Sequence, residues 1–305
     1  MRTIALGLFG LTLLCMTHGE AAARARAGGD FAAQSSPARE AALLAARSCG
    51  PCREADCALE AAPEARRRNA SLYKAPPEIL AIIEAASMLT RVDFDYLLRT
   101  AALESSFDPA REVKTSSAVG LYQFVEQTWF HMMQEIGGEF GLEDVTGAIA
   151  AGEGGYEVAD ADARAEILRL RYEPELSALF AGMFTRRNAE FLAKALGREP
   201  DPGELYVAHV MGAAGAAELI RLAAEEPDAK ANKHFARAAR ANRTIFFEDK
   251  KPRTVAEVLD ILRNKYWKIP VYAEDHAPWI SAPLPAWGPL PAPLMGGDEL
   301  LYAAN

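Results

Sequence analysis

The chain has 305 residues, a formal net charge of -9 and a composition that is 50% hydrophobic and 25% charged. This length is sufficient for a domain with one buried core. The acidic balance argues against nucleic acid as a partner and against a strong electrostatic attraction to anionic polymers.

Residues 1–27 have the pattern of a secretory signal peptide. Arg2 precedes an apolar run, and A-x-A cleavage patterns follow at Ala21-Ala22-Ala23 and Ala25-Arg26-Ala27. The apolar run is shorter than the roughly 20 residues that a membrane span requires. We therefore expect a periplasmic or secreted protein with no stable membrane span after cleavage. Cleavage after Ala27 would remove three arginines and one glutamate, which changes the net charge from -9 to -11.

Residues 28–75 form a leader rich in Ala, Arg and Glu, and it contains a cluster of three cysteines: Cys49, Cys52 and Cys57. A C-x-x-C pair can be a redox site, part of a metal site or a disulfide. No strand pattern precedes Cys49, which disfavours the redox interpretation, and a zinc site normally needs four ligands. In an oxidising compartment we expect one disulfide among the three cysteines and one remaining thiol. We expect no metal and no organic cofactor.

The folded domain is expected over residues 76–268, beginning with a helix after Pro76-Pro77. Ile79, Ile82, Ile83 and Ala86 give that helix an apolar face. The pattern predicts a second helix with Asp93 as its N-cap and with Leu97, Ala101 and Glu104 on one face. Asp108-Pro109 limits its extent, because proline disfavours a helical conformation in the residue before it.

Glu104 is an unusual residue for the inner face of a helix. Burial of a carboxylate disfavours its charged form, which suits a general acid. A structural glutamate whose hydrogen bonds are satisfied inside the core would give the same pattern.

The central part of the domain alternates between turns and helices. Residues 116–124 predict a short extended turn or small hairpin. A helix containing Trp129, Met132, Met133 and Ile136 then ends at Gly137-Gly138. The Gly-rich, acidic residues 138–162 are expected to form a loop.

The rest of the domain is expected to be mostly helical. Helices are predicted over residues 163–171, 174–196, 202–211, 218–225, 229–240 and 255–266. Gly197 would end the long helix, and Asp201 would cap the one that carries Tyr206 and His209. Thr254 and Glu257 form a capping-box pattern for the last helix.

Residues 269–305 are a proline-rich tail with Trp279 and Trp287 interleaved. Such a composition is typical of an extended linker or of a segment that binds a protein partner, and it contributes little to a core.

Two motifs around Glu104 together resemble the soluble lytic transglycosylase domain, which is related in fold to goose-type lysozyme. Glu104-Ser105-Ser106-Phe107 matches an E-S-x-F motif, and Ala118-Val119-Gly120-Leu121-Tyr122-Gln123 matches a G-A-x-G-L-M-Q-type turn, followed by Thr128-Trp129. Ser117 replaces the first glycine and Tyr122 replaces the methionine. A third motif, A-Y-N-A-G, is altered to Ala208-His209-Val210-Met211-Gly212.

The resemblance implies a mostly α, lysozyme-like helical domain with a small extended turn at the cleft. It implies that the protein cleaves the glycan strands of peptidoglycan non-hydrolytically, between N-acetylmuramic acid and N-acetylglucosamine, leaving a 1,6-anhydro end. Glu104 would be the catalytic residue, acting as acid and then as base. Ser105, Tyr122 and Gln123 would contact or orient the sugar, and Tyr206 or His209 would hold Glu104.

Three alternatives remain open at this stage. A lysozyme-type hydrolase could use the same fold, with a water held by Asp108 or another acid. A binding module could hold glycan without cutting it, as the altered third motif allows. A redox protein could be built on Cys49 and Cys52.

Overall fold

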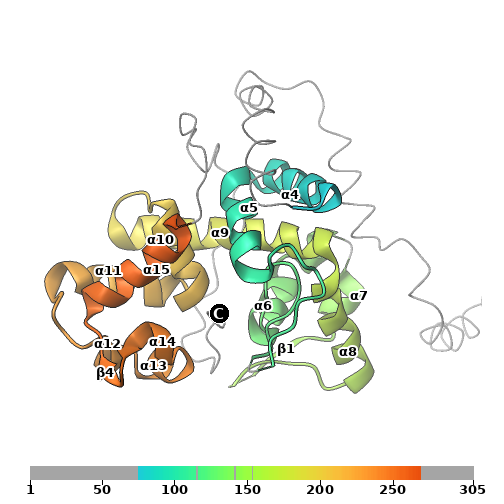
Figure 1. Cartoon of the computed structure of the whole chain (residues 1–305). Coiled ribbons are helices and arrows are strands. Elements are labelled where there is room, and N and C mark those ends of the chain that lie inside the picture. The colour runs from blue at the N-terminus through green and yellow to red at the C-terminus, as the bar shows by residue number, and fades with distance from the viewer. Residues whose placement is uncertain (1–74, 115, 141, 153, 269–305) are drawn as a thin grey trace, which may run out of the picture. The chain divides into compact units, whose positions relative to one another are not determined.

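The computed structural model describes residues 75–114, 116–140, 142–152 and 154–268 (Figure 1). The chain divides into two units, Met1–Ser36 and Pro37–Asn305, and all described residues belong to the second. The predicted signal peptide, the cysteine cluster with Cys49, Cys52 and Cys57, and the proline-rich tail lie outside the described residues.

The described part of the chain is mostly helical, with helix over 68% of it, which confirms the mostly α fold class. Its elements in chain order are α4 (Pro77–Thr90), α5 (Phe94–Ser105), α6 (Glu126–Ile136), η1 (Gly137–Phe140), α7 (Glu143–Thr146), β1 (Ala150–Gly152), β2 (Gly155–Glu157), α8 (Ala161–Arg169), η2 (Leu170–Tyr172), α9 (Pro174–Leu196), α10 (Pro202–Met211), α11 (Ala213–Glu225), α12 (Ala231–His234), α13 (Ala236–Ala241), α14 (Arg243–Phe246), β3 (Phe247–Glu248), β4 (Lys251–Pro252) and α15 (Val255–Trp267). The two sheets are antiparallel β1–β2 and β3–β4 hairpins.

Helix α5 begins and ends as the sequence predicts. The Asp93 carboxylate accepts a hydrogen bond from the backbone N–H of Tyr96 at 2.9 Å, which satisfies one of the free donors of the first turn. The helix ends at Ser106, whose φ of 56° is left-handed. Glu104 therefore lies in the last turn, on the buried side of the helix.

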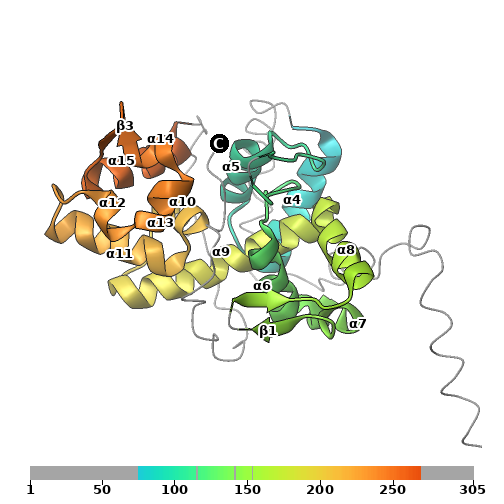
Figure 2. The same ribbon diagram turned by 90° about the horizontal axis from the view of Figure 1, so that it is seen from below.

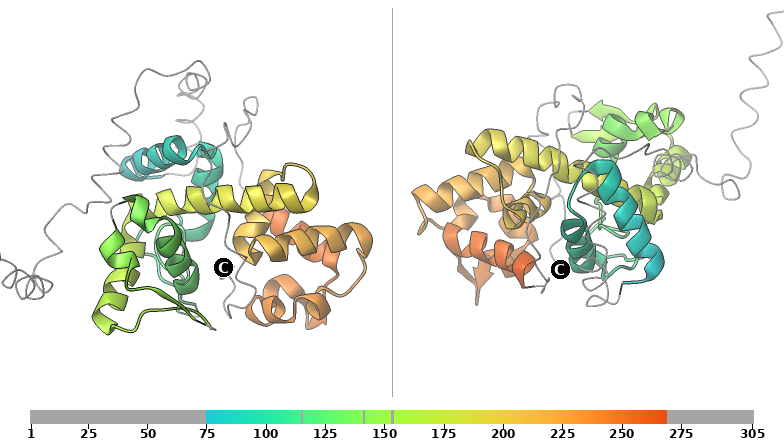
Figure 3. Two further views of the ribbon diagram at one scale, coloured as in Figure 1. Left: turned by 180° about the vertical axis from the view of Figure 1, so that it is seen from behind. Right: turned by 90° about the horizontal axis from the view of Figure 1, so that it is seen from above.

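Helix α9 is the long element on which the others assemble. It packs against α4 and α5 and also against α10 and α11 (Figure 2). Figure 3 shows it passing between α4 on one side and α11 on the other. The approach to α4 is close, because a Cβ atom on Gly182 would lie 2.4 Å from Thr90 Oγ1. Only glycine fits at this crossing.

The caps predicted for the C-terminal helices are present. Asp201 and Glu204 form a capping box at the start of α10, and Thr254 and Glu257 form another at the start of α15. Gly197 ends α9 in a left-handed conformation with φ of 67°. Local side-chain chemistry therefore sets the ends of these helices.

The structure differs from the predictions in three segments. Residues 138–162 contain η1, α7 and the β1–β2 hairpin instead of an open loop. The hairpin is held by a distant residue, since the Gln127 amide bonds both the N–H and the carbonyl of Tyr156. Helix α11 begins at Ala213 instead of 218, and residues 229–240 form two short helices instead of one.

Candidate active site

Glu104 is a buried carboxylate with 6% of its surface exposed. It is placed by the last turn of α5, immediately before the chain leaves the helix. Ser106 and Phe107, which follow the last helical residue Ser105, have φ values of 56° and 67°. Left-handed backbone in two consecutive non-glycine residues costs free energy, and such strain is concentrated at functional sites.

Two side chains from α10 contact the Glu104 carboxylate. The Tyr206 hydroxyl donates to Glu104 Oε1 at 3.2 Å, and His209 Nε2 lies 3.5 Å from the same oxygen. Residues three apart share one face of a helix, and the two rings stack with centroids 5.8 Å apart. The pKa of Tyr206 is raised well above its usual value, mainly by burial and secondly by the negative charge of Glu104. Tyr206 therefore remains a hydrogen-bond donor at neutral pH.

Two other glutamates with buried carboxylates have different partners. Glu135 is ion-paired with Arg187, and Glu204 with Arg198 at 2.7 Å. Burial raises the pKa of Glu204, but the bonds from Arg198 and from the backbone of Asp201 outweigh it and lower that pKa overall. Within the described residues, no Lys or Arg forms an ion pair with Glu104. Its partners are a phenol and an imidazole.

The turn of residues 116–124 is joined to the end of α5. Val119 forms isolated antiparallel bridges with Glu112 and Phe124, as expected for a short extended turn. Ser105 Oγ donates to the Leu121 carbonyl oxygen at 2.8 Å. The hydroxyl of Ser105 is therefore occupied in fixing this turn beside Glu104.

Gly120 and Arg171 fix the conformation of the same turn. Arg171 Nη1 donates to the carbonyl oxygens of Ser117 at 2.7 Å and Phe124 at 3.1 Å. Gly120 has φ of 85°, and a Cβ atom there would lie 2.1 Å from the Arg171 carbonyl oxygen. Glycine is required here both by the backbone conformation and by the space available.

Gln123 lies in this turn with φ of 51° and is 1% exposed. Its Nε2 donates to the carbonyl oxygens of Arg111 at 3.0 Å and Gly120 at 2.9 Å. Its Oε1 is buried and has no hydrogen-bond partner within the described residues. The amide donors thus stabilise the turn, and in this conformation the oxygen is buried and offers no surface to a ligand.

Tyr122 is a core residue in this structure. Its ring is fully buried, and its hydroxyl donates to the Leu97 carbonyl oxygen at 3.1 Å. Burial raises the pKa of Tyr122 well above its usual value. In this conformation Tyr122 offers no surface to a ligand. Its expected part in contacting or orienting the sugar stays a prediction.

The structure thus places Glu104, Tyr206 and His209 in contact although α5 and α10 are distant in sequence. Sequence reasoning missed the role of Arg171, which it placed only at the end of a helix. It also missed the Gln127–Tyr156 pairing that holds the β1–β2 hairpin. An arginine beside apolar residues gives no signal of which carbonyl groups it will bind.

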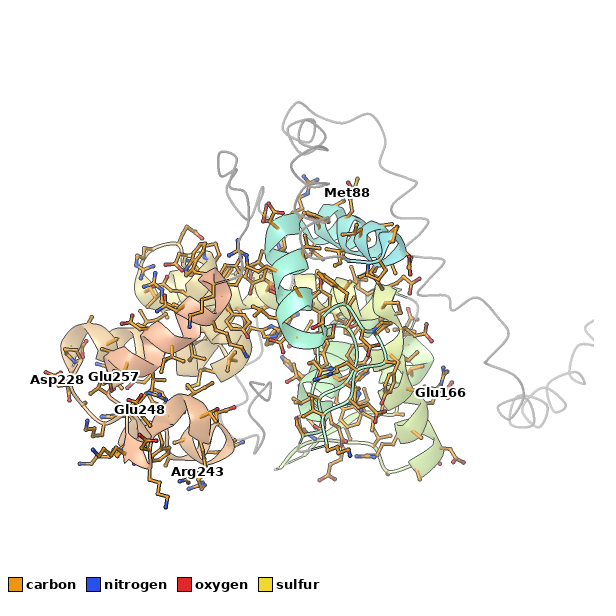
Figure 4. All side chains as sticks on the ribbon, viewed as in Figure 1. Met88, Glu166, Asp228, Arg243, Glu248 and Glu257 are labelled. Carbon is orange, nitrogen blue, oxygen red and sulfur yellow. The ribbon has the colours of Figure 1, made fainter. Side chains whose placement is uncertain are left out.

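Figure 4 shows the side chains of all described residues. Among them, no group of three or more His, Cys, Asp or Glu side chains is arranged to hold a metal ion. None of the helices in this part of the chain combines the length and the apolar character needed to cross a membrane. No protein-family model matches the chain.

Proposed function

We propose that this protein is a peptidoglycan lytic transglycosylase with a lysozyme-like catalytic domain at about residues 76–268. The observation that carries the proposal is the environment of Glu104: a buried carboxylate on a strained helix end, in contact with Tyr206 and His209 and joined to the Gly120 turn. The matches around Glu104 and Gly120 support the same assignment. The proposed location is the periplasm or the outside of the cell.

In the proposed reaction Glu104 first donates its proton to the oxygen that links N-acetylmuramic acid to N-acetylglucosamine. As the bond breaks, the substrate's own acetamido group stabilises the positive centre at C1. Glu104, now a carboxylate, takes the proton from the C6 hydroxyl, and that oxygen bonds to C1. The product is a 1,6-anhydro ring and no water is consumed, so the protein would be a lyase.

Tyr206 has a defined part in this cycle. Its hydroxyl stabilises Glu104 most when the carboxylate is charged, because hydrogen bonds to charged groups are the stronger ones. The ring of His209 packs on Tyr206 and lies beside the same oxygen. Both residues are positioning residues for the catalytic carboxyl group.

The next three carboxylates that follow Glu104 in the chain are engaged elsewhere, which favours a scheme with a single acid. Asp108 is exposed and accepts from the Ala110 N–H, and Glu112 is exposed and accepts from the Tyr172 hydroxyl. Glu126 is ion-paired with Arg164. A hydrolase of the usual type would need a second carboxylate facing the sugar.

The test is mass spectrometry of the sugars released from purified peptidoglycan. The unchanged chain and Asp108→Asn should both release fragments ending in 1,6-anhydro-muramic acid, and Glu104→Gln should release none. Reducing-end products that disappear with Asp108→Asn would instead establish the lysozyme-type hydrolase. Glycan binding without any release by the unchanged chain would establish a binding module.

A further inference from the structure

The segment of residues 229–254, called here the basic segment, has a charge opposite to that of the whole chain. It contains eight basic and two acidic residues, a net charge of +6, whereas the chain carries -9. The basic residues are Lys230, Lys233, Arg237, Arg240, Arg243, Lys250, Lys251 and Arg253. A local positive surface of this kind attracts anions even when the net charge of the protein is negative.

The basic segment is folded into the short elements α12, α13, α14, β3 and β4. Arg253 holds them together, since its Nη1 donates to the carbonyl oxygens of Thr244 at 2.7 Å and Phe247 at 2.9 Å. Ala231 N–H also donates to the Arg253 carbonyl oxygen at 3.1 Å. Arg253 is therefore structural, and the remaining basic side chains stand on a defined scaffold.

Six of these side chains are exposed and belong to none of the ion pairs within the described residues: Lys230, Lys233, Arg240, Arg243, Lys250 and Lys251. Figure 4 shows Arg243 pointing outward at the edge of this region. Several exposed arginines elsewhere are paired, as Arg221 is with Glu218 and Glu225, and Arg164 with Glu126. Exposed Arg111 belongs to none of the ion pairs within the described residues. The positive charge of the basic segment is thus available to a ligand.

We propose that the basic segment binds the carboxylates of the peptide stems that substitute the glycan at Glu104. This inference rests on the proposed function and extends it from the sugar chain to the peptide part of the same polymer. Peptide stems present separate carboxylates on an otherwise uncharged glycan, so a basic surface of limited extent suffices to bind them.

The charge distribution favours separate carboxylates over a continuous polyanion such as DNA. Residues 143–175, which include β1, β2 and α8, carry eight acidic residues and only three basic ones among the described positions. A duplex with one charge per about 1.7 Å would be repelled there. An uncharged sugar chain would not be repelled by these acidic residues.

The first experiment measures cosedimentation with insoluble peptidoglycan at low ionic strength. All proteins carry Glu104→Gln so that the polymer is not degraded during the assay. Lys233→Glu combined with Arg240→Glu should weaken binding at least fivefold. The control, Lys194→Glu combined with Lys268→Glu, makes the same charge change at exposed positions outside the basic segment and should bind as the parent does.

The second experiment repeats the assay on glycan from which an amidase has removed the peptide stems. The lactyl carboxylates that this hydrolysis leaves on the glycan are first converted to uncharged amides. Here the two double variants and the parent should bind equally. Equal binding to intact peptidoglycan, or a difference that persists on the stripped glycan, would overturn the proposal. Tighter binding to duplex DNA than to peptidoglycan, lost in the Lys233/Arg240 variant, would assign the surface to nucleic acid instead.

These outcomes are separate from the test of the chemistry. Binding is measured without turnover, whereas the anhydro product is measured with the unchanged Glu104. A chain that binds through the basic segment and releases no anhydro product would refute the proposed reaction alone. A chain that releases that product with unaltered binding by the charge variants would refute this inference alone.

Discussion

Replacing Gly120 by alanine tests how the turn beside Glu104 is held. Gly120 has φ of 85°, and the added Cβ would lie 2.1 Å from the Arg171 carbonyl oxygen, which is backbone and cannot rotate away. A left-handed non-glycine residue costs about 1–2 kcal/mol, and overpacking adds about 1–3 kcal/mol. The expected loss in free energy of unfolding is therefore about 2–5 kcal/mol.

Gly197→Ala is the matched control for this prediction. Gly197 also has a left-handed conformation, with φ of 67°, but nothing lies within 4 Å of its added Cβ. The free energy of unfolding of Gly197→Ala should fall only by the cost of the left-handed backbone, about 1–2 kcal/mol. In urea unfolding and in thermal melts, where 1 kcal/mol corresponds to roughly 2–4 °C, Gly120→Ala should be clearly the less stable variant. Equal losses would refute the close approach of this turn to Arg171.

Two further predictions concern titratable side chains. Tyr206→Phe removes the hydrogen bond to Glu104, and a hydrogen bond to a charged group contributes about 1.5–3 kcal/mol. We therefore expect kcat/KM for peptidoglycan to fall roughly tenfold or more. The pH–rate profile should also shift. An unchanged rate and profile would exclude a positioning role. Burial is the main cause that lowers the pKa of His131 to about 4, and the positive charge of Arg187 is the second. The Glu135 carboxylate lies 3.6 Å from His131 Nε2, and its negative charge, which would raise this pKa, is outweighed. Between about pH 4 and 6.5 the unfolded chain therefore binds more protons at His131 than the folded chain does. The free energy of unfolding should fall as the pH drops through this range. The contribution of His131 to this loss is at most about 3 kcal/mol. Urea titrations at several pH values should show a smaller loss for His131→Gln, and an identical pH dependence would refute this contribution.

Much of the secondary structure could be predicted because it depends on short-range chemistry. Asp93, Asp201 and Thr254 cap their helices as expected, since an N-cap oxygen needs only a backbone N–H two or three residues further on. Gly197 ends α9 because glycine accepts the left-handed conformation. The inward position of Glu104 followed from the helical period alone.

The β1–β2 hairpin could not be predicted in this way. Its strands have three residues each, and β1 is fully exposed, so no alternation of polar and apolar residues marks it. Its pairing is supported by Gln127 and His131 of α6, which bond Tyr156 across the tertiary fold.

In the candidate site, too, some features could be predicted from the sequence and others depend on the tertiary structure. The sequence by itself determined which residue types are present: an inward acid at the end of a helix, a glycine-containing turn, and Tyr206 and His209 on one helical face. Only the tertiary structure decided that both α10 side chains reach the same oxygen of Glu104, that Ser105 and Tyr122 are used to hold backbone carbonyls, and that Arg171 fixes the turn. The physical reason is that hydrogen bonds between distant segments depend on how helices pack, and the periodicity of a single segment contains no information about its partner.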